Sequence, residues 1–145
     1  MAVVAAVLLV ACGGDDDAAD ADGGVTVTDA WARATPGGVT VGAVYLSVTS
    51  DVDDELLGAT VDPGVAATVD LHATETAADG TATMEQQDAL AVPAGGELVL
   101  EPIGNHLMLV GLADALTVGE SFEVTLEFAV AGDEVVQVEV REDAP

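Results

Sequence analysis

The stretch Gly104-Asn105-His106-Leu107-Met108-Leu109 sets the fold class and the candidate site of this chain. From the histidine onward it is typical of a β-strand, because β-favouring apolar residues follow one another without a turn signal. In a strand, residues two positions apart point to the same face. His106 and Met108 are therefore predicted to present an imidazole and a thioether side by side, while Leu107 and Leu109 turn to the core. That pair of donors suits a soft metal ion.

The chain's other histidine and its other non-initiator methionine, His72 and Met84, lie upstream of this stretch. In Val69–Thr74 apolar and polar residues alternate, which predicts that Leu71 faces the core and that His72 points outward. The same alternation, carried back from Leu107, places Ile103 on the core face of the later strand.

A hairpin turn is expected between His72 and Met84, and the length of its loop decides which face Met84 takes. An odd loop, Ala78–Gly80 or Thr76–Gly80, puts Met84 on the face of His72, opposite it or one diagonal away. A two-residue Asp79-Gly80 turn would break this relation. A single histidine or methionine on a strand is most often solvated or core-filling. Four such donors on solvent-side faces are harder to attribute to packing, so we predict a metal site built from His72, Met84, His106 and Met108.

The chain from Val25 onward consists of short strand patterns separated by turns rich in Pro, Gly and Asp. No segment of ten or more residues carries a helical apolar stripe, and no internal repeat is present. The predicted strands are Val25–Trp31, Ala43–Thr49, Val69–Thr74, Glu97–Ile103, His106–Val110, Phe122–Val130 and Val135–Val140. This pattern predicts an all-β fold, an antiparallel β-sandwich.

Composition narrows the possible partners. The chain has 145 residues, 50% of them hydrophobic, which is enough for one domain with a core that needs no disulfide. Its 27 acidic residues against two arginines and no lysine give a net charge of -25. Such a charge argues against nucleic acid or an anionic lipid surface as a partner. It fits either adaptation to salt or a general compositional bias.

The N-terminus predicts export and a lipid anchor. Ala2–Ala11 is an apolar run too short to cross a membrane and suited to a secretory signal, although no basic residue precedes it. It ends in Leu9-Val10-Ala11-Cys12, which resembles the lipobox of bacterial lipoproteins, and Cys12 would be the lipidated residue. We predict a signal peptide at residues 1–12, a flexible acidic tether at 13–24 and the folded domain at 25–145.

Ligand chemistry selects the metal. Imidazole and thioether are neutral, borderline to soft ligands, and a site with methionine sulfur and no thiolate favours Cu(I) over zinc, iron, calcium or magnesium. With Cys12 assigned to the signal, the domain has no thiolate for a blue-copper centre, an iron-sulfur cluster or a cysteine-based zinc site. Acidic neighbours such as Asp70 leave Cu(II) binding open.

The spacing of the four donors resembles the signature of the PCu(A)C family of periplasmic and extracellular copper chaperones. His72 and Ala73 are followed by ten residues, Met84, 21 residues, and then His106-Leu107-Met108. The position after the first histidine is often methionine in the family, and alanine stands there in this chain. Further similar segments are Asp29–Pro36, Gly42–Tyr45, Pro93–Gly96 and His106–Leu112.

The resemblance implies a Greek-key β-sandwich of the cupredoxin-like type that carries one Cu(I) per monomer. It also implies delivery of copper to cytochrome c oxidase, with subunit II as the acceptor, by a protein anchored to the outer face of the cell membrane. Transfer would proceed by ligand exchange and would need no catalytic residue.

Two other functions stay open at this stage: a copper storage or scavenging lipoprotein, and a sandwich-type interaction module that binds no metal. An enzyme is not favoured, because no serine has the glycines of a nucleophile elbow and no paired acid-base groups are apparent. Calcium at Asp51, Asp53 and Glu55 is not favoured either, because the loop lacks the glycine and the final glutamate of an EF-hand.

Overall fold

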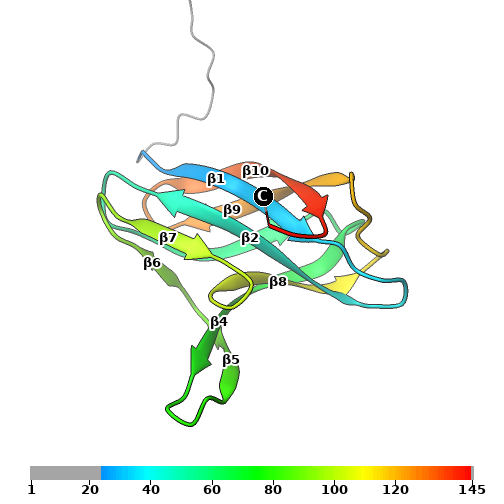
Figure 1. Cartoon of the computed structure of the whole chain (residues 1–145). Helices are drawn as coiled ribbons and strands as arrows, with labels where there is room; N and C mark the ends of the chain where they lie inside the picture. Colours follow the sequence, from blue (N-terminus) through cyan, green and yellow to red (C-terminus); the bar gives the residue numbers. More distant parts are fainter. Residues whose placement is uncertain (1–23, 145) are drawn as a thin grey trace, which may run out of the picture.

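The computed structural model describes residues 24–144, and this part of the chain forms strands without any helix (Figure 1). The strands are β1 (Thr26–Arg33), β2 (Val41–Thr49), β3 (Asp54–Val61), β4 (Ala66–Thr76), β5 (Ala82–Gln87), β6 (Leu90–Val92), β7 (Glu97–Leu100), β8 (His106–Leu112), β9 (Ser121–Phe128) and β10 (Gly132–Arg141). Within this span nothing helical is long and apolar enough to serve as a membrane crossing. The predicted signal peptide, with Cys12, and nearly all of the predicted tether lie outside the described residues.

The strands form one continuous sheet in the order β5-β4-β8-β2-β1-β10-β9-β3-β6, and β7 pairs with β2 beside this path. The sheet folds back on itself, so that buried residues of β2, β4 and β8 share one cluster with those of β3, β9 and β10. The predicted all-β class is confirmed. One pair differs from the antiparallel prediction: β1 and β10 run parallel over Trp31–Arg33 and Glu139–Arg141.

The core follows from alternation along each strand. On β8, Leu107 and Leu109 are fully buried, and on β4 Leu71 is 3% exposed. On β2, Val44, Leu46 and Val48 point inward in the same way. Burying side chains of this size stabilises a fold by about 1.5–3 kcal/mol each, which is why the apolar positions fix the register of each strand.

Ile103 shows where the sequence pattern was wrong. Alternation predicts Ile103 on the core face, yet its side chain is 84% exposed. The strand that contains Glu97 ends at Leu100, and a turn follows in which Glu101 accepts a backbone hydrogen bond from Gly104 at 3.0 Å. Because Pro102 cannot donate to a strand ladder, the chain turns at this point and Ile103 is carried outward.

Three strands are absent from the predicted set: β5, which only the expected hairpin implies, and β3 and β6, which nothing in the pattern indicates. In β3 the neighbours Leu56 and Leu57 break the alternation, and only Leu56 is buried, whereas Leu57 is 47% exposed. β6 has only three residues, so no period can be detected in it. The seven predicted strands are all present, with ends shifted by up to three residues.

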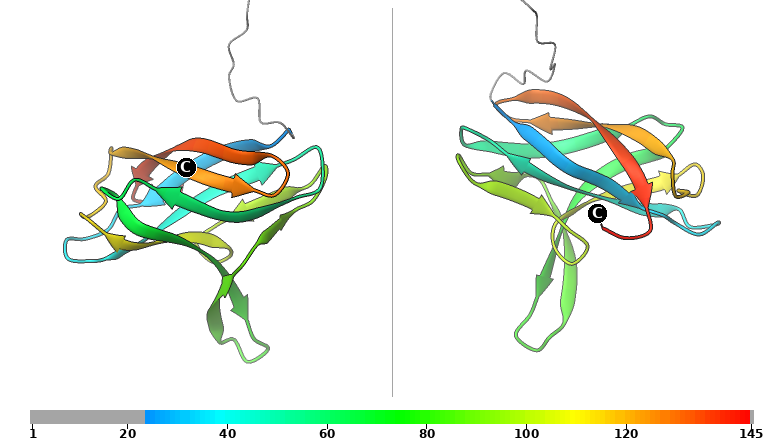
Figure 2. Two further views of the ribbon diagram at one scale, coloured as in Figure 1. Left: turned by 180° about the vertical axis from the view of Figure 1, so that it is seen from behind. Right: turned by 45° about the horizontal axis from the view of Figure 1, so that its top comes forward.

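The hairpin of β4 and β5 extends beyond the body of the fold (Figure 1; Figure 2 shows the same projection from two other sides). β4 pairs with β8 from Ala66 to His72, and its last four residues pair with β5 alone. The hairpin therefore carries residues from the edge of the sheet into solvent.

Candidate metal centre

Three neighbouring strands bring the four predicted donors together. His72 of β4 is paired directly with His106 of β8, and Met108 follows two residues along β8. On β5, Met84 pairs with Thr74, two residues beyond His72. Thr76 pairs with Ala82 and Ala77 donates its backbone N–H to Thr81 at 2.8 Å, so the loop is the odd one expected, residues 78–80. Met84 consequently lies on the face of His72, one diagonal away.

The two imidazole rings face each other with their centroids 5.7 Å apart and their planes at 44°. Nδ1 of His106 lies 3.2 Å from the carbonyl oxygen of Gly104. Because a carbonyl only accepts, this hydrogen bond requires the proton on Nδ1, and in that neutral tautomer the lone pair of Nε2 would be free to bind a metal. Nδ1 of His72 is buried and has no hydrogen-bond partner among residues 24–144. An unpaired buried nitrogen beside a second imidazole fits a ligand position better than a structural one.

The exposure of the donors differs from the prediction at one position. Alternation predicts His106 on a solvent-side face. It does lie on the face opposite to Leu107 and Leu109, but it is only 4% exposed. His72 and Met108 are half-buried, and Met84 is 60% exposed. Alternation predicts correctly which side of the sheet a side chain takes, whereas the burial of that side chain depends on the neighbours that cover it.

The neighbours that cover His106 are aromatic. The ring of Tyr45 on β2 lies 6.5 Å from that of His106, and the ring of Trp31 on β1 lies 4.8 Å from that of Tyr45. Trp31, Tyr45, His106 and His72 thus form a row across four adjacent strands, which we call the aromatic row. Trp31 is 5% and Tyr45 6% exposed, so the row closes the β1 side of the site.

A bulge in β1 makes the row possible. Simple alternation from Val25 and Val27 would put Trp31 on the core side. The register with β2 shifts between Thr28 and Trp31, where Asp29 has a φ of 54°, and the extra residue turns Trp31 to the outer face. Sequence analysis missed the contribution of Trp31 and Tyr45; the available signal was that they are the chain's only tryptophan and only tyrosine.

Charged groups around the row are few. Arg33 follows Trp31 on the same face and pairs with Arg141, which binds Glu139 at 2.9 Å. Burial raises the pKa of the Tyr45 hydroxyl, and the nearby Arg33 guanidinium offsets part of that rise. The phenol therefore stays neutral around pH 7. Asp70 on β4 lies directly opposite Met108 of β8, on the same face of the sheet as the proposed donors.

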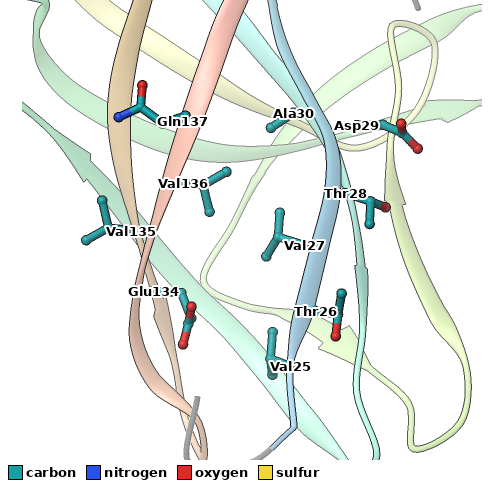
Figure 3. Close-up of a pocket in the computed structure, with 10 residues that line it drawn as sticks. All are labelled: Val25, Thr26, Val27, Thr28, Asp29, Ala30, Glu134, Val135, Val136 and Gln137. Atoms are coloured by element: carbon teal, nitrogen blue, oxygen red, sulfur yellow. The ribbon is translucent and has the colours of Figure 1, made fainter. Parts of the chain in front are cut away.

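Five pockets among residues 24–144 are lined by residues other than the four donors. A groove of about 410 Å³ between β1 and β10 is lined by residues such as Val27, Val136 and Glu134 (Figure 3). It contains none of the four donors. Residues 24–144 also contain no group of three or more His, Cys, Asp and Glu side chains that could hold a metal ion. Within this part of the chain the two imidazoles have no third side chain of these types beside them, and Met84 and Met108 are the soft donors on the same face.

Comparison with known proteins places the chain among lipoprotein relatives. A family model described as "Putative lipoprotein LpqE-like" matches residues 25–140. A protein of Leifsonia xyli subsp. xyli (strain CTCB07), named "Putative lipoprotein Lxx21020", is 33% identical over 119 residues, which is 82% of this chain and 70% of that protein.

Comparison with solved structures identifies the fold. The copper-bound PCuAC domain from PmoF2 superposes with a TM-score of 0.67 at 28% identity, over 86% of this chain and 97% of that one. The Cu(I) form of DR1885 from Deinococcus radiodurans gives a TM-score of 0.62 at 31% identity, over 79% of this chain and 76% of that one. These likenesses confirm the resemblance to PCu(A)C domains seen in the sequence. With a family match that spans residues 25–140, the chain belongs to the LpqE-like family and has the fold of a PCuAC domain.

Proposed function

We propose that this domain is an extracytoplasmic copper chaperone that binds one Cu(I) through His72, Met84, His106 and Met108. The observation that carries the proposal is the directly paired histidines, 5.7 Å apart between ring centroids, with a thioether next along β8 and another across the hairpin. The structural likeness to two copper-loaded PCuAC domains supports the same metal.

The donor set suits monovalent copper. Two imidazoles and two thioethers are all neutral, so they stabilise Cu(I) without the charge that Cu(II) or zinc would require from carboxylates or thiolates. Nε2 of His106 is held ready by the bond of Nδ1 to Gly104, which is the usual way that a second contact fixes the ligating nitrogen. The aromatic row keeps water away from that side.

Transfer follows from the same chemistry. Neutral ligands hold Cu(I) less firmly than charged thiolates, so passage to an acceptor with cysteine ligands is downhill. An acceptor ligand can enter while some donor bonds remain, and the chaperone needs no acid, base or nucleophile of its own. Copper is the cargo here and not a resident cofactor.

The test is an anaerobic titration of the full chain with Cu(I) against a chromophoric chelator, in a Cys12→Ser background so that the lone thiol does not compete. We expect one-to-one binding that weakens more than about tenfold in His72→Ala and in Met108→Ala. Gln86→Ala is the matched control, since Gln86 faces His72 across the hairpin but offers no soft donor. Absence of binding, or binding indifferent to both ligand changes, would overturn the proposal.

The acceptor that we propose is the copper centre of cytochrome c oxidase subunit II. Its support is the likeness to PCuAC domains and the downhill direction of transfer to thiolates. Mixing the Cu(I)-loaded chain with the isolated copper domain of that subunit should move copper to the acceptor. Retention of copper by the chain would instead indicate storage or scavenging.

We also propose that Cys12 is lipidated and anchors the domain to the outer face of the cell membrane. The lipoprotein family match and the relative named as a lipoprotein support this. Cells that express the full chain should incorporate labelled palmitate into it and retain it in the membrane fraction. A Cys12→Ala chain that is still labelled and retained would exclude this anchor.

A further inference from the structure

The four proposed ligands do not share one rigid support. The β4–β8 ladder ends at the His72–His106 pair, because β8 begins at His106. Beyond this pair the chain continues as a two-stranded hairpin of residues 73–85, which we call the arm. Met84 lies on the arm, past the end of the ladder, whereas His72, His106 and Met108 lie on paired strands of the sheet.

The arm has little to hold it in place. Every residue from Ala82 to Gln86 is exposed, and the buried core cluster contains no side chain from residues 73–85. The views in Figures 1 and 2 show the arm directed away from the rest of the fold. An isolated two-stranded hairpin is at best marginally stable in water, and such segments open more readily than the core.

The opposite half of the site is fixed. His106 is 4% exposed, and its strand is anchored by the fully buried Leu107 and Leu109. On the β1 side, the buried ring of Tyr45 lies beside His106 and the buried ring of Trp31 lies beside Tyr45. Met84 is the most exposed of the four proposed ligands, at 60%, so an incoming ligand would reach the metal most readily from its side.

We propose that Met84 is the exchangeable ligand: it leaves the copper first, and the acceptor's ligand enters at the position that Met84 vacates, on the arm side. This inference rests on the proposed function and adds to it an order of events and a direction. His72, His106 and Met108 hold the metal during the exchange.

The exchange conserves charge and electrons. The incoming thiolate donates a sulfur lone pair to Cu(I) and a copper-sulfur bond forms, while the bond from copper to the Met84 sulfur breaks and that sulfur keeps its own lone pair. Copper remains Cu(I), so no oxidant or reductant takes part. If the incoming group arrives as a thiol, its proton passes to water.

The test follows Met84 and Met108 separately by NMR. The full chain, in the Cys12→Ser background, is labelled with 13C at the methionine methyl groups, and the signals are assigned with Met84→Leu and Met108→Leu. Loading with Cu(I) should shift both signals. Dithiothreitol, a thiol of known affinity for Cu(I), is then added in steps under anaerobic conditions.

We expect the Met84 signal to return to its copper-free position while the Met108 signal still shows bound copper. Return of Met108 first, or of both together, would overturn the inference while leaving copper binding intact. If neither signal shifts on loading, the proposed function itself fails and the inference fails with it. The two failures are thus distinguishable.

A second measurement tests the arm without touching a ligand. Gly80, in the turn of the arm, has a φ of 86° and no neighbour within 4 Å of an added Cβ. Gly80→Ala therefore strains the turn without a clash, and we expect copper loss to dithiothreitol to become about fivefold faster or more. Gly119→Ala is the matched control, with a φ of 93°, similar free space and a place in another turn. Equal rates in the two variants would contradict the role of the arm.

Discussion

Replacing Asp54 by alanine is expected to destabilise the domain by about 3 kcal/mol. This carboxylate is 5% exposed and lies at the start of β3, against the turn between β9 and β10. Oδ1 accepts hydrogen bonds from the backbone N–H of Glu55 at 2.7 Å and of Val130 at 2.8 Å, and Oδ2 accepts one from Ala131 at 3.0 Å. Asp54 thus ties a turn to a strand far away in the chain.

The magnitude follows from these bonds. Hydrogen bonds to a charged group contribute roughly 1.5–3 kcal/mol each. Two of the three bonds connect distant segments, so losing both would lower the free energy of unfolding by about 3–6 kcal/mol. Val130 is 56% exposed, so water can replace part of what its N–H loses. The lower end of the range, about 3 kcal/mol, is therefore the expected cost.

The pH dependence gives an independent check. Burial alone raises the pKa of Asp54, but the N–H donors of Val130, Ala131 and Glu55 outweigh burial and hold the pKa below its ordinary value of 3.8. A carboxyl with a lowered pKa in the folded state stabilises the fold above its unfolded pKa. That contribution is lost as pH falls through the folded pKa. The difference between wild type and Asp54→Ala should be constant from pH 5 to 8 and should shrink below about pH 4.

Urea unfolding of the full chain measures this difference. Removing one negative charge from a chain of net charge -25 lessens self-repulsion, so a matched control is needed. Asp133→Asn supplies it, because Asp133 is exposed on β10 near the same turn. If Asp54→Ala costs no more than Asp133→Asn, or if its cost is unchanged at pH 3, the assigned role of this carboxylate is refuted.

Three further outcomes are expected. Leu107→Ala removes a fully buried side chain between two proposed ligands and should cost about 2–5 kcal/mol in urea unfolding; a cost below 1 kcal/mol would contradict the packing of β8. Limited peroxide should oxidise Met84, which is 60% exposed, before the half-buried Met108, an order that peptide mass spectrometry follows. The oxidation should weaken Cu(I) binding while the circular dichroism spectrum stays unchanged. Gly111→Ala should lower the melting temperature by several degrees, since φ is 73° and the new Cβ would lie 2.9 Å from that of Ala67; an unchanged melting temperature would refute the strain.

The sequence predicts the faces of the candidate residues well where local periodicity decides the outcome. The faces of His72 and Met108 follow from alternation, and that of Met84 follows from the parity of one short loop. Register between distant strands is different. Nothing local in the chain shows that His72 pairs with His106, because that pairing depends on how β4 and β8 slide past each other until both bury their leucines.

The same distinction explains what was missed. Trp31 reaches the outer face only because of the bulge at Asp29, and a single inserted residue leaves no periodic signal. The burial of His106 depends on Tyr45, which comes from another strand. The parallel pairing of β1 with β10 joins the two ends of the domain, so no hairpin or short loop could have predicted it.

The placement of the rare residues bears on metal selectivity. The chain has 27 acidic side chains, yet residues 24–144 contain no metal-like group of three His, Cys, Asp and Glu. Both histidines, both non-initiator methionines, the one tryptophan, the one tyrosine and both arginines lie instead on one face of the sheet. A carboxylate ring around two imidazoles would bind hard and borderline divalent cations. In the proposed site the four donors are neutral and Asp70 is the nearby carboxylate, so the proposed site would discriminate between metals by softness. Asp70→Asn should therefore leave Cu(I) affinity nearly unchanged and weaken Cu(II) binding, and a large loss of Cu(I) affinity would show that the carboxylate belongs to the site.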